Sequence, residues 1–416
     1  MSDQRQNPAS RCYIHPPAKL SLHPLGLVAV VILASLTLQA QNFNVLSSLT
    51  GSDGSYPLYI NLYSEGNLYG TTYYGGLYGD GVVFRLSQRG SGWLMTTLFN
   101  FSGQNDGGSP YSGVVTGPDG SLYGTTEVGG RYGYGLVYKL QPPPTPCKAV
   151  ICYWMETVLY NFTGYSDGSG PQGNLLFDQA GNIYGTAIYG GSDFGTLWKL
   201  TPSQGQWSLT MLHTFTGASD GSHPVGGVIR DQSGNLYGVA SSGGTYGAGV
   251  AYEVSYGGSG WTETVLHSFG NTNDGEYPSG LISDAQGNLY GFTTGGGSSA
   301  WGTAYEFQLS EGGFSYHIIY TFEPNLGAGP ELTNLPTLHA GNLYGAATTG
   351  GNGRAGAVFE LTPSGGSWNF LSLHDFTGPD GGWPAGSPLL DAAGNLYGVT
   401  EVGGAHDQGV VWEITP

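Results

Sequence analysis

The chain is poor in charge, in cysteine and in helical periodicity. Charged residues make up 10% of its 416 residues, whereas typical soluble domains contain roughly 25%. Acidic residues outnumber basic ones and the net charge is −18, so we expect neither nucleic acid nor an anionic lipid surface as a partner. No window carries an apolar stripe at helical spacing over three turns. These absences favour an all-β protein.

Cysteine is nearly absent. Two of the three cysteines, Cys147 and Cys152, lie together in one oversized loop, residues 141–153. If the protein is exported, two cysteines this close are expected to form a local disulfide. No other Cys or His lies near them in the sequence, so a metal site in this loop is not expected.

A hydrophobic run of membrane-spanning length is also lacking. The apolar run Leu25–Leu38 is shorter than the about 20 residues that a spanning helix needs. Basic residues precede it and Gln39-Ala40 follow it, which is the pattern of an export signal. We therefore interpret residues 1–40 as a signal peptide and expect a periplasmic, cell-surface or secreted protein without a membrane span. An uncleaved N-terminal anchor is the alternative.

What the chain has in abundance is a repeat. The phrase Gly-Asn-Leu-Tyr-Gly, with small variations, occurs seven times, and consecutive copies lie 53, 54 or, once, 61 residues apart. This is the signature of a tandem array of one supersecondary unit. The loop 141–153 accounts for the long interval. The repeated tyrosines are Tyr69, Tyr123, Tyr184, Tyr237, Tyr290, Tyr344 and Tyr397.

Each repeat contains four short apolar runs of strand length. In the fourth copy they are Gly226–Asp231, Asn235–Ala240, Gly249–Val254 and the preceding Trp207–Phe215, separated by Gly, Asp, Asn, Ser and Pro. A four-stranded unit of about 50 residues predicts one blade of a β-propeller. A single blade cannot bury both faces of its sheet, so neighbouring blades must cover one another. The glycine of the second strand, Gly238 in this copy, is expected to let the next blade approach closely.

The two ends of the chain predict how the ring closes. The last repeat stops after a third strand, Gly409–Pro416, and the chain after the leader begins with a fourth-strand look-alike, Phe43–Thr50. We therefore predict that residues 41–416 form a seven-bladed β-propeller of four-stranded blades, the last one completed by the N-terminal strand. Closure removes the exposed sheet edges that invite aggregation.

The repeats resemble the GloVer tandem-repeat family of exported bacterial proteins. The likeness lies in segments such as Gly120–Thr126, Gly129-Gly130 and Gly135–Leu140, and it extends over nearly all of residues 43–416. It implies an exported repeat protein of unassigned activity and transfers no catalytic residue. The Gly-Gly doublet with a downstream Trp is also similar to kelch repeats, more weakly.

Two kinds of loop carry the candidate binding residues. The inter-blade loop joins the fourth strand of one repeat to the first strand of the next, and the Gly-Gly loop joins the second and third strands. Antiparallel strand order puts both on one face of the ring, which we call the Asp-Gly face. Its candidate carboxylates are Asp53, Asp106, Asp167, Asp220, Asp274 and Asp380, and its candidate exposed aromatics are Tyr78, Tyr132, Tyr246 and Trp301.

Carboxylates beside exposed rings suit the binding of a hydroxyl-rich sugar, a cation or a calcium-bridged group. The competing interpretation is local: Asp stabilises tight turns by accepting backbone hydrogen bonds, and the rings pack over glycines. We expect no cofactor and no metal site, and calcium is the one alternative that the carboxylates leave open.

Three further patterns favour structural roles. The G-x-S-x-G stretches Gly164–Gly168 and Gly217–Gly221 lie in inter-blade loops, whereas a nucleophile elbow needs a strand-to-helix turn. The three fourth-strand histidines, His213, His267 and His374, share a position that Phe, Tyr or Ser fills in other repeats, which indicates packing. The turns between first and second strands carry D-x-x-G-N, which indicates Asp-stabilised turns. These aspartates are Asp178, Asp231, Asp284 and Asp391.

The pattern favours a non-enzymatic, exported and monomeric propeller that binds a glycan or a protein through the Asp-Gly face. One alternative is a carbohydrate-active hydrolase or lyase with a carboxylate pair on that face. Near-equivalent repeats argue against it, because catalysis usually requires one blade to differ. A purely structural envelope protein is the third hypothesis.

The leader generates a first testable prediction. The exported protein is expected to begin at Gln41, because the apolar run ends in Leu-Gln-Ala. Intact-mass measurement of the protein recovered outside the cytoplasm checks this, and a retained leader would contradict it.

Overall fold

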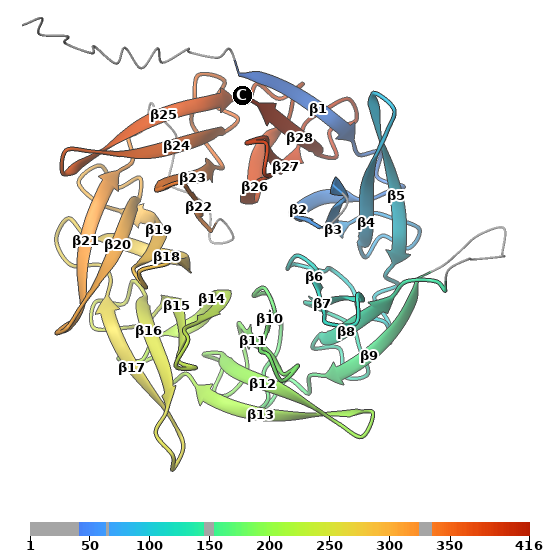
Figure 1. Ribbon diagram of the computed structural model, residues 1–416. Helices are drawn as coiled ribbons and strands as arrows, with labels where there is room; N and C mark the ends of the chain where they lie inside the picture. The colour runs from blue at the N-terminus through green and yellow to red at the C-terminus, as the bar shows by residue number, and fades with distance from the viewer. Residues whose placement is uncertain (1–40, 64–65, 145–153, 324–334) are drawn as a thin grey trace, which may run out of the picture. The chain divides into compact units, whose positions relative to one another are not determined.

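A computed structural model describes residues 41–63, 66–144, 154–323 and 335–416. The described residues form seven four-stranded antiparallel sheets arranged as the blades of a β-propeller (Figure 1). The fold expected from the repeats is therefore confirmed. Residues 1–40, and with them the expected signal peptide, lie outside the described residues, as do Cys147 and Cys152. Among the residues described, no helix is long and apolar enough to cross a membrane.

In blades 1 to 6 the strands follow chain order from the innermost to the outermost (Figure 1). Blade 1 consists of β2 (Ser55–Leu62), β3 (Leu68–Tyr74), β4 (Val82–Arg89) and β5 (Gly92–Asn100). Blade 2 consists of β6 (Val115–Thr116), β7 (Leu122–Thr126), β8 (Leu136–Gln141) and β9 (Met155–Asn161). Blade 3 consists of β10 (Leu176–Phe177), β11 (Ile183–Ala187), β12 (Thr196–Ser203) and β13 (Gln206–Thr214).

Blades 4 to 6 continue the same order. Blade 4 consists of β14 (Ser222–Arg230), β15 (Leu236–Ser242), β16 (Val250–Tyr256) and β17 (Trp261–Ser268). Blade 5 consists of β18 (Gly275–Ser283), β19 (Leu289–Gly296), β20 (Thr303–Ser310) and β21 (Gly313–Thr321). Blade 6 consists of β22 (Thr337–His339), β23 (Asn342–Ala347), β24 (Ala357–Ser364) and β25 (Ser367–Asp375).

Blade 7 is built from both ends of the chain. It consists of β26 (Gly382–Leu390), β27 (Leu396–Val402), β28 (Val410–Thr415) and, as its outermost strand, β1 (Asn42–Ser48). β1 pairs antiparallel with β28, with Phe43 opposite Ile414. The Phe43 ring also stacks on His374 of blade 6, with centroids 3.7 Å apart. The predicted closure is therefore confirmed.

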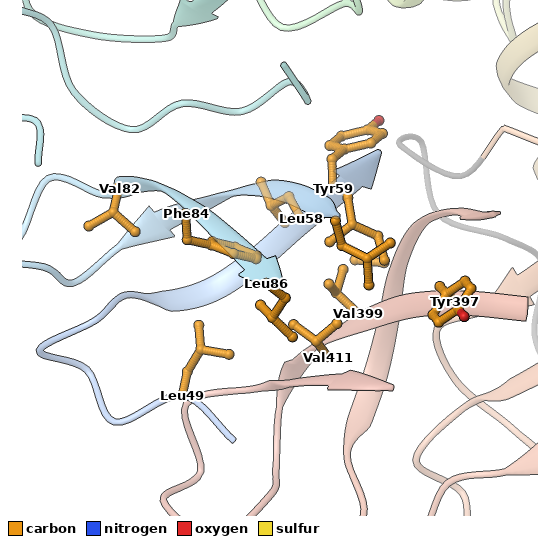
Figure 2. Close-up of a cluster of buried hydrophobic side chains, with 12 residues drawn as sticks. Leu49, Leu58, Tyr59, Val82, Phe84, Leu86, Tyr397, Val399 and Val411 are labelled. Carbon is orange, nitrogen blue, oxygen red and sulfur yellow. The ribbon is translucent and has the colours of Figure 1, made fainter. Parts of the chain in front are cut away.

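The apolar core lies between neighbouring blades. At the junction of blades 7 and 1, Leu58 and Phe84 of blade 1 pack in one buried cluster with Val399 and Val411 of blade 7 (Figure 2). None of these four side chains is more than 5% exposed. Each blade thus buries its sheet faces against its neighbours, and the ring must close to leave none exposed.

The second-strand glycine has a different role from the one expected. A Cβ at Gly238 would lie 2.5 Å from the hydroxyl oxygen of Tyr252, which belongs to the third strand of the same blade. A Cβ at Gly70 would likewise meet Phe84 of its own blade at 2.4 Å. The glycine therefore makes room for a buried ring that crosses it within the sheet, because these two residues face each other in the strand register.

The turns between first and second strands are stabilised by aspartate, as predicted. Asp231 accepts hydrogen bonds from the backbone N–H of Asn235 at 2.8 Å, from its side-chain amide at 2.9 Å, and from the Tyr237 hydroxyl at 3.2 Å. The repeated tyrosine therefore closes the turn that precedes it. Equivalent bonds surround Asp178, Asp284 and Asp391.

Ring closure generates a prediction. Phe43→Ala should lower the free energy of unfolding by about 2–3 kcal/mol, because it removes a partly buried ring that bridges β1 to blade 6. The neighbouring Val45 is 41% exposed, so Val45→Ala should change it by less than about 0.5 kcal/mol. Urea unfolding of both variants checks the difference. Equal effects would show that β1 adds no specific contact to the ring.

Candidate functional site

The inter-blade and Gly-Gly loops meet on one face, as their antiparallel order requires. In blade 4 the backbone N–H of Gly244 donates to the carbonyl oxygen of Ala218 at 2.8 Å. Equivalent bonds join Gly76 to Gly51, Gly130 to Gln104, Gly191 to Tyr165 and Gly404 to Gly378, and in blade 5 Gly297 donates to the backbone carbonyl of Asp274. The candidate carboxylates and aromatics therefore share the Asp-Gly face.

Most candidate carboxylates turn back into their own loops. Asp220 accepts hydrogen bonds from the backbone N–H of Thr216 at 2.9 Å and from its hydroxyl at 2.5 Å. A Ser or Thr three or four residues earlier binds Asp53, Asp106, Asp167 and Asp380 in the same way. This hydrogen bonding is that of turn-stabilising residues. The face therefore offers less free carboxylate than the sequence indicates.

A fourth-strand residue also contacts the Asp of the following loop. The Nε2 atoms of His213, His267 and His374 lie 3.2, 2.8 and 2.9 Å from the carboxylates of Asp220, Asp274 and Asp380. The sequence pattern indicated only a packing role for these histidines, and the pairing was not predicted. The signal was the short separation between the histidine and the aspartate, which is seven residues in two blades and six in the third.

The same fourth-strand position contacts the next blade. His267 stacks on Tyr316 with centroids 3.9 Å apart, and Tyr320 stacks on Phe370 with centroids 5.6 Å apart. In blades 2 and 4 the residue equivalent to Tyr316 is an acid, Glu156 or Glu263.

Burial is the main cause of the shifted pKa values of Glu156 and Glu263. It raises the pKa of Glu156 to about 8 and that of Glu263 to about 7, and the nearby carboxylates of Asp106 and Asp220 add to the shift. Within the described part of the chain, one buried carboxyl oxygen of each acid has no hydrogen-bond partner. Burial also lowers the pKa of His213, against the opposing pull of Asp220.

One cavity of about 660 Å³ opens on the Asp-Gly face at the junction of blades 4 and 5. Tyr246 and Asp274, both candidates from the sequence, contribute to its lining with His267 and Tyr316. The Tyr246 ring is 53% exposed. Thr245, Ser268, Asn271, Thr272 and Asn273 add polar side chains to the wall, and Val265, Leu266 and Ile318 add apolar ones.

Asp274 is a fixed anion in this wall. It accepts hydrogen bonds from the Tyr316 hydroxyl at 2.6 Å and the Gly275 N–H at 2.8 Å, and it contacts His267. Burial alone would raise its pKa, but the hydrogen bonds from His267 and Tyr316 outweigh burial and lower it. Only 8% of Asp274 is exposed. The carboxylate therefore holds the wall in shape and is poorly placed to attack a substrate.

The other candidate aromatics lie apart from this cavity. Tyr78, Tyr132 and Trp301 are 60%, 49% and 40% exposed. The guanidinium of Arg131 lies 5.5 Å from the centroid of the Tyr132 ring. Among the residues that the structure describes, no three His, Cys, Asp or Glu side chains converge into a metal-binding group.

Comparisons with known proteins agree with the fold. Residues 31–225, 153–335 and 307–416 match the Gloeobacter/Verrucomicrobia repeat. No curated protein matches this chain. The extracellular domain of a proposed one-component system from B. thetaiotaomicron is 14% identical, with a TM-score of 0.53 over 90% of this chain and 40% of the other. At that identity the likeness shows the fold alone.

Two further solved structures are less similar. A proposed 6-phosphogluconolactonase from Bacteroides uniformis is 13% identical, with a TM-score of 0.47 over 86% of this chain and 98% of the other. A protein of unknown function from Dyadobacter fermentans is 10% identical, with a TM-score of 0.45 over 90% and 99%.

The raised pKa of Glu263 generates a prediction. A carboxyl whose pKa rises on folding, from 4.5 to about 7 here, contributes stability below pH 4.5 and loses that contribution as the pH rises through 7. Glu263→Gln removes this loss. The variant should exceed the wild type in free energy of unfolding by about 1 kcal/mol at pH 8, after allowance for solvent screening, and by less at pH 5.

Urea titrations at the two pH values measure this difference. The exposed Glu311 lies in the loop between β20 and β21, so Glu311→Gln is the control and should have the same small effect at both. A Glu263→Gln effect that does not grow with pH would contradict the account of this junction.

Proposed function

This chain belongs to the Gloeobacter/Verrucomicrobia repeat family, and we propose that it is an exported, non-enzymatic β-propeller that binds a neutral glycan on its Asp-Gly face. The observation that carries the proposal is the cavity at blades 4 and 5, which combines a half-exposed tyrosine ring with amides and hydroxyls. A sugar ring has an apolar face of C–H groups and a rim of hydroxyls, and this wall complements both.

A neutral ligand fits the charge of the protein better than an ionic one. The net charge of −18 repels anions. Cations find few free carboxylates, because the aspartates of the Asp-Gly face are engaged in their own loops, as at Asp220 and Asp380. The proposal therefore needs neither calcium nor another cofactor.

The cavity favours binding over catalysis. Asp274 already accepts two short hydrogen bonds besides contacting His267, and its lowered pKa makes it a poor proton donor. Glu156 and Glu263 have pKa values nearer neutrality, but neither lines this cavity and each has a buried oxygen at a blade junction. A carboxylate pair flanking a bound sugar, as glycoside hydrolysis needs, is not assembled in this wall.

The proposal predicts that Tyr246→Ala lowers the affinity for a bound oligosaccharide about tenfold, because an exposed ring in contact with a ligand is removed. Tyr246→Phe keeps the ring and should retain most of the affinity. Isothermal titration of the mature protein with cellohexaose, xylohexaose, mannohexaose and maltohexaose measures the effect. A wild-type protein that binds none of these at millimolar concentration would refute the proposal.

A further inference from the structure

In six blades the structure describes a residue in the left-handed backbone conformation directly before a proline, at the start of the first strand or a few residues before it. In four blades this residue carries a large ring: Tyr56, His223, Tyr277 and Trp383 have φ values between 54° and 59°. In blades 2 and 3 the position holds Ser109 and Gly170, with φ values of 51° and 61°. The corresponding part of blade 6 lies outside the described residues.

A backbone contact between blades explains the conformation. The N–H of Tyr277 donates to the carbonyl oxygen of Ala248 in the preceding blade at 2.8 Å, and the N–H of Gly170 donates to Tyr134 in the same way at 3.1 Å. The bond uses only the main chain, so it does not require a ring. Glycine adopts this conformation without strain, whereas a bulky residue is strained there. Gly170 shows that the fold accepts glycine at this position.

Packing does not account for Tyr277 and Trp383, which are both 44% exposed. Tyr56 and His223 are partly buried and meet Tyr74 and Tyr189 edge-to-face. A large residue with a strained backbone lowers stability, and when its side chain is half exposed it gains few packing contacts to offset that loss. Residues with such strained backbones concentrate at functional sites. The four rings belong to blades 1, 4, 5 and 7, at the start of the innermost strands, which surround the centre of the ring (Figure 1).

Other rings extend this surface at blades 1 and 2. Tyr56 meets Tyr74 edge-to-face at 5.6 Å, Tyr74 meets Tyr73 at 4.5 Å, and Tyr73 meets Tyr111 at 5.8 Å. Tyr74 is 48% exposed, and the Tyr73 hydroxyl donates to the Glu127 carboxylate at 2.7 Å. The four tyrosine rings therefore form one connected row, in which the hydrogen bond to Glu127 fixes the position of Tyr73.

We propose that Tyr56, Tyr74, His223, Tyr277 and Trp383, which we call the inner crown, are the principal sugar-stacking surface of this protein. The inner crown rests on the proposed function and deepens it, because it adds a second contact surface on the Asp-Gly face to the cavity of Tyr246. The ligand class is a neutral oligosaccharide of several units, since crown residues stand on different blades and one sugar ring cannot reach them all.

The test removes the strained rings. In the mature protein, the double variant Trp383→Gly/Tyr277→Gly places at both positions the glycine that blade 3 has at Gly170. Its melting temperature should stay unchanged or rise slightly, because relief of strain offsets the extra freedom of glycine in the unfolded chain. Its affinity for whichever of cellohexaose, xylohexaose, mannohexaose and maltohexaose the wild type binds should fall at least tenfold. Calorimetry measures both quantities.

The control is Tyr256→Gly, which removes a ring that is 59% exposed at the end of β16, away from the Asp-Gly face. It should lower the melting temperature, because glycine weakens a strand, and leave affinity unchanged. A double variant that binds as well as the wild type overturns the inner crown and leaves the glycan-binding proposal intact. A double variant that melts several degrees lower also overturns it, because the rings would then be packing residues. A wild type that binds none of the probes overturns both proposals.

Discussion

The structure depends on one constraint: a four-stranded blade has two faces that need burial, and only neighbouring blades can bury them. The apolar clusters are accordingly shared between blades, as with Leu58 of blade 1 and Val411 of blade 7. An open array would leave a bare face at each end, so the gain from every junction requires the last blade to meet the first. β1 completes this requirement by pairing with β28, and Phe43 extends it to blade 6 by stacking on His374.

The same constraint requires the repeats to share their backbone contacts but lets their loop side chains vary. Backbone hydrogen bonds between loops recur from blade to blade, for example Tyr277 to Ala248 and Gly170 to Tyr134. They fix the loops without specifying side chains, so the side chains at these positions differ widely. The Asp-Gly face is where main-chain geometry is constant and side chains vary, which suits a binding surface on a rigid scaffold.

Much of this fold could be predicted from the sequence because it is periodic. The spacing of the repeated tyrosines indicated seven blades, and Phe43–Thr50 indicated the closure, since both are patterns along the chain. Side-chain contacts between neighbouring blades leave no periodic pattern in the sequence, so they could not be predicted. The stacking of His267 on Tyr316 joins residues of two repeats, and the equivalent positions vary from Ser to Phe. The role of Gly238 was misjudged because Tyr252 comes from the adjacent strand of its own blade.

The candidate site was predicted less well, for physical reasons. Asp-Gly pairs indicated exposed carboxylates, but nearby hydroxyls and backbone N–H groups engage them, as Thr216 engages Asp220. A residue before proline is normally extended, so the left-handed conformation of Trp383 could not be foreseen. It arises because its N–H bonds to Ala355 of the preceding blade, a contact that exists only once the ring is assembled.

The Asp-Gly face, and not the opposite face, is proposed to bind a neutral oligosaccharide. Hydrogen–deuterium exchange of the mature protein, with and without a saturating hexasaccharide, distinguishes the two faces. Binding at the Asp-Gly face should slow exchange at the strand starts 55–57, 275–278 and 382–384 and in the loop 243–249, with no change in the hairpins 203–206 and 256–261 on the opposite face. Slower exchange confined to those hairpins, or unchanged exchange everywhere, would contradict it.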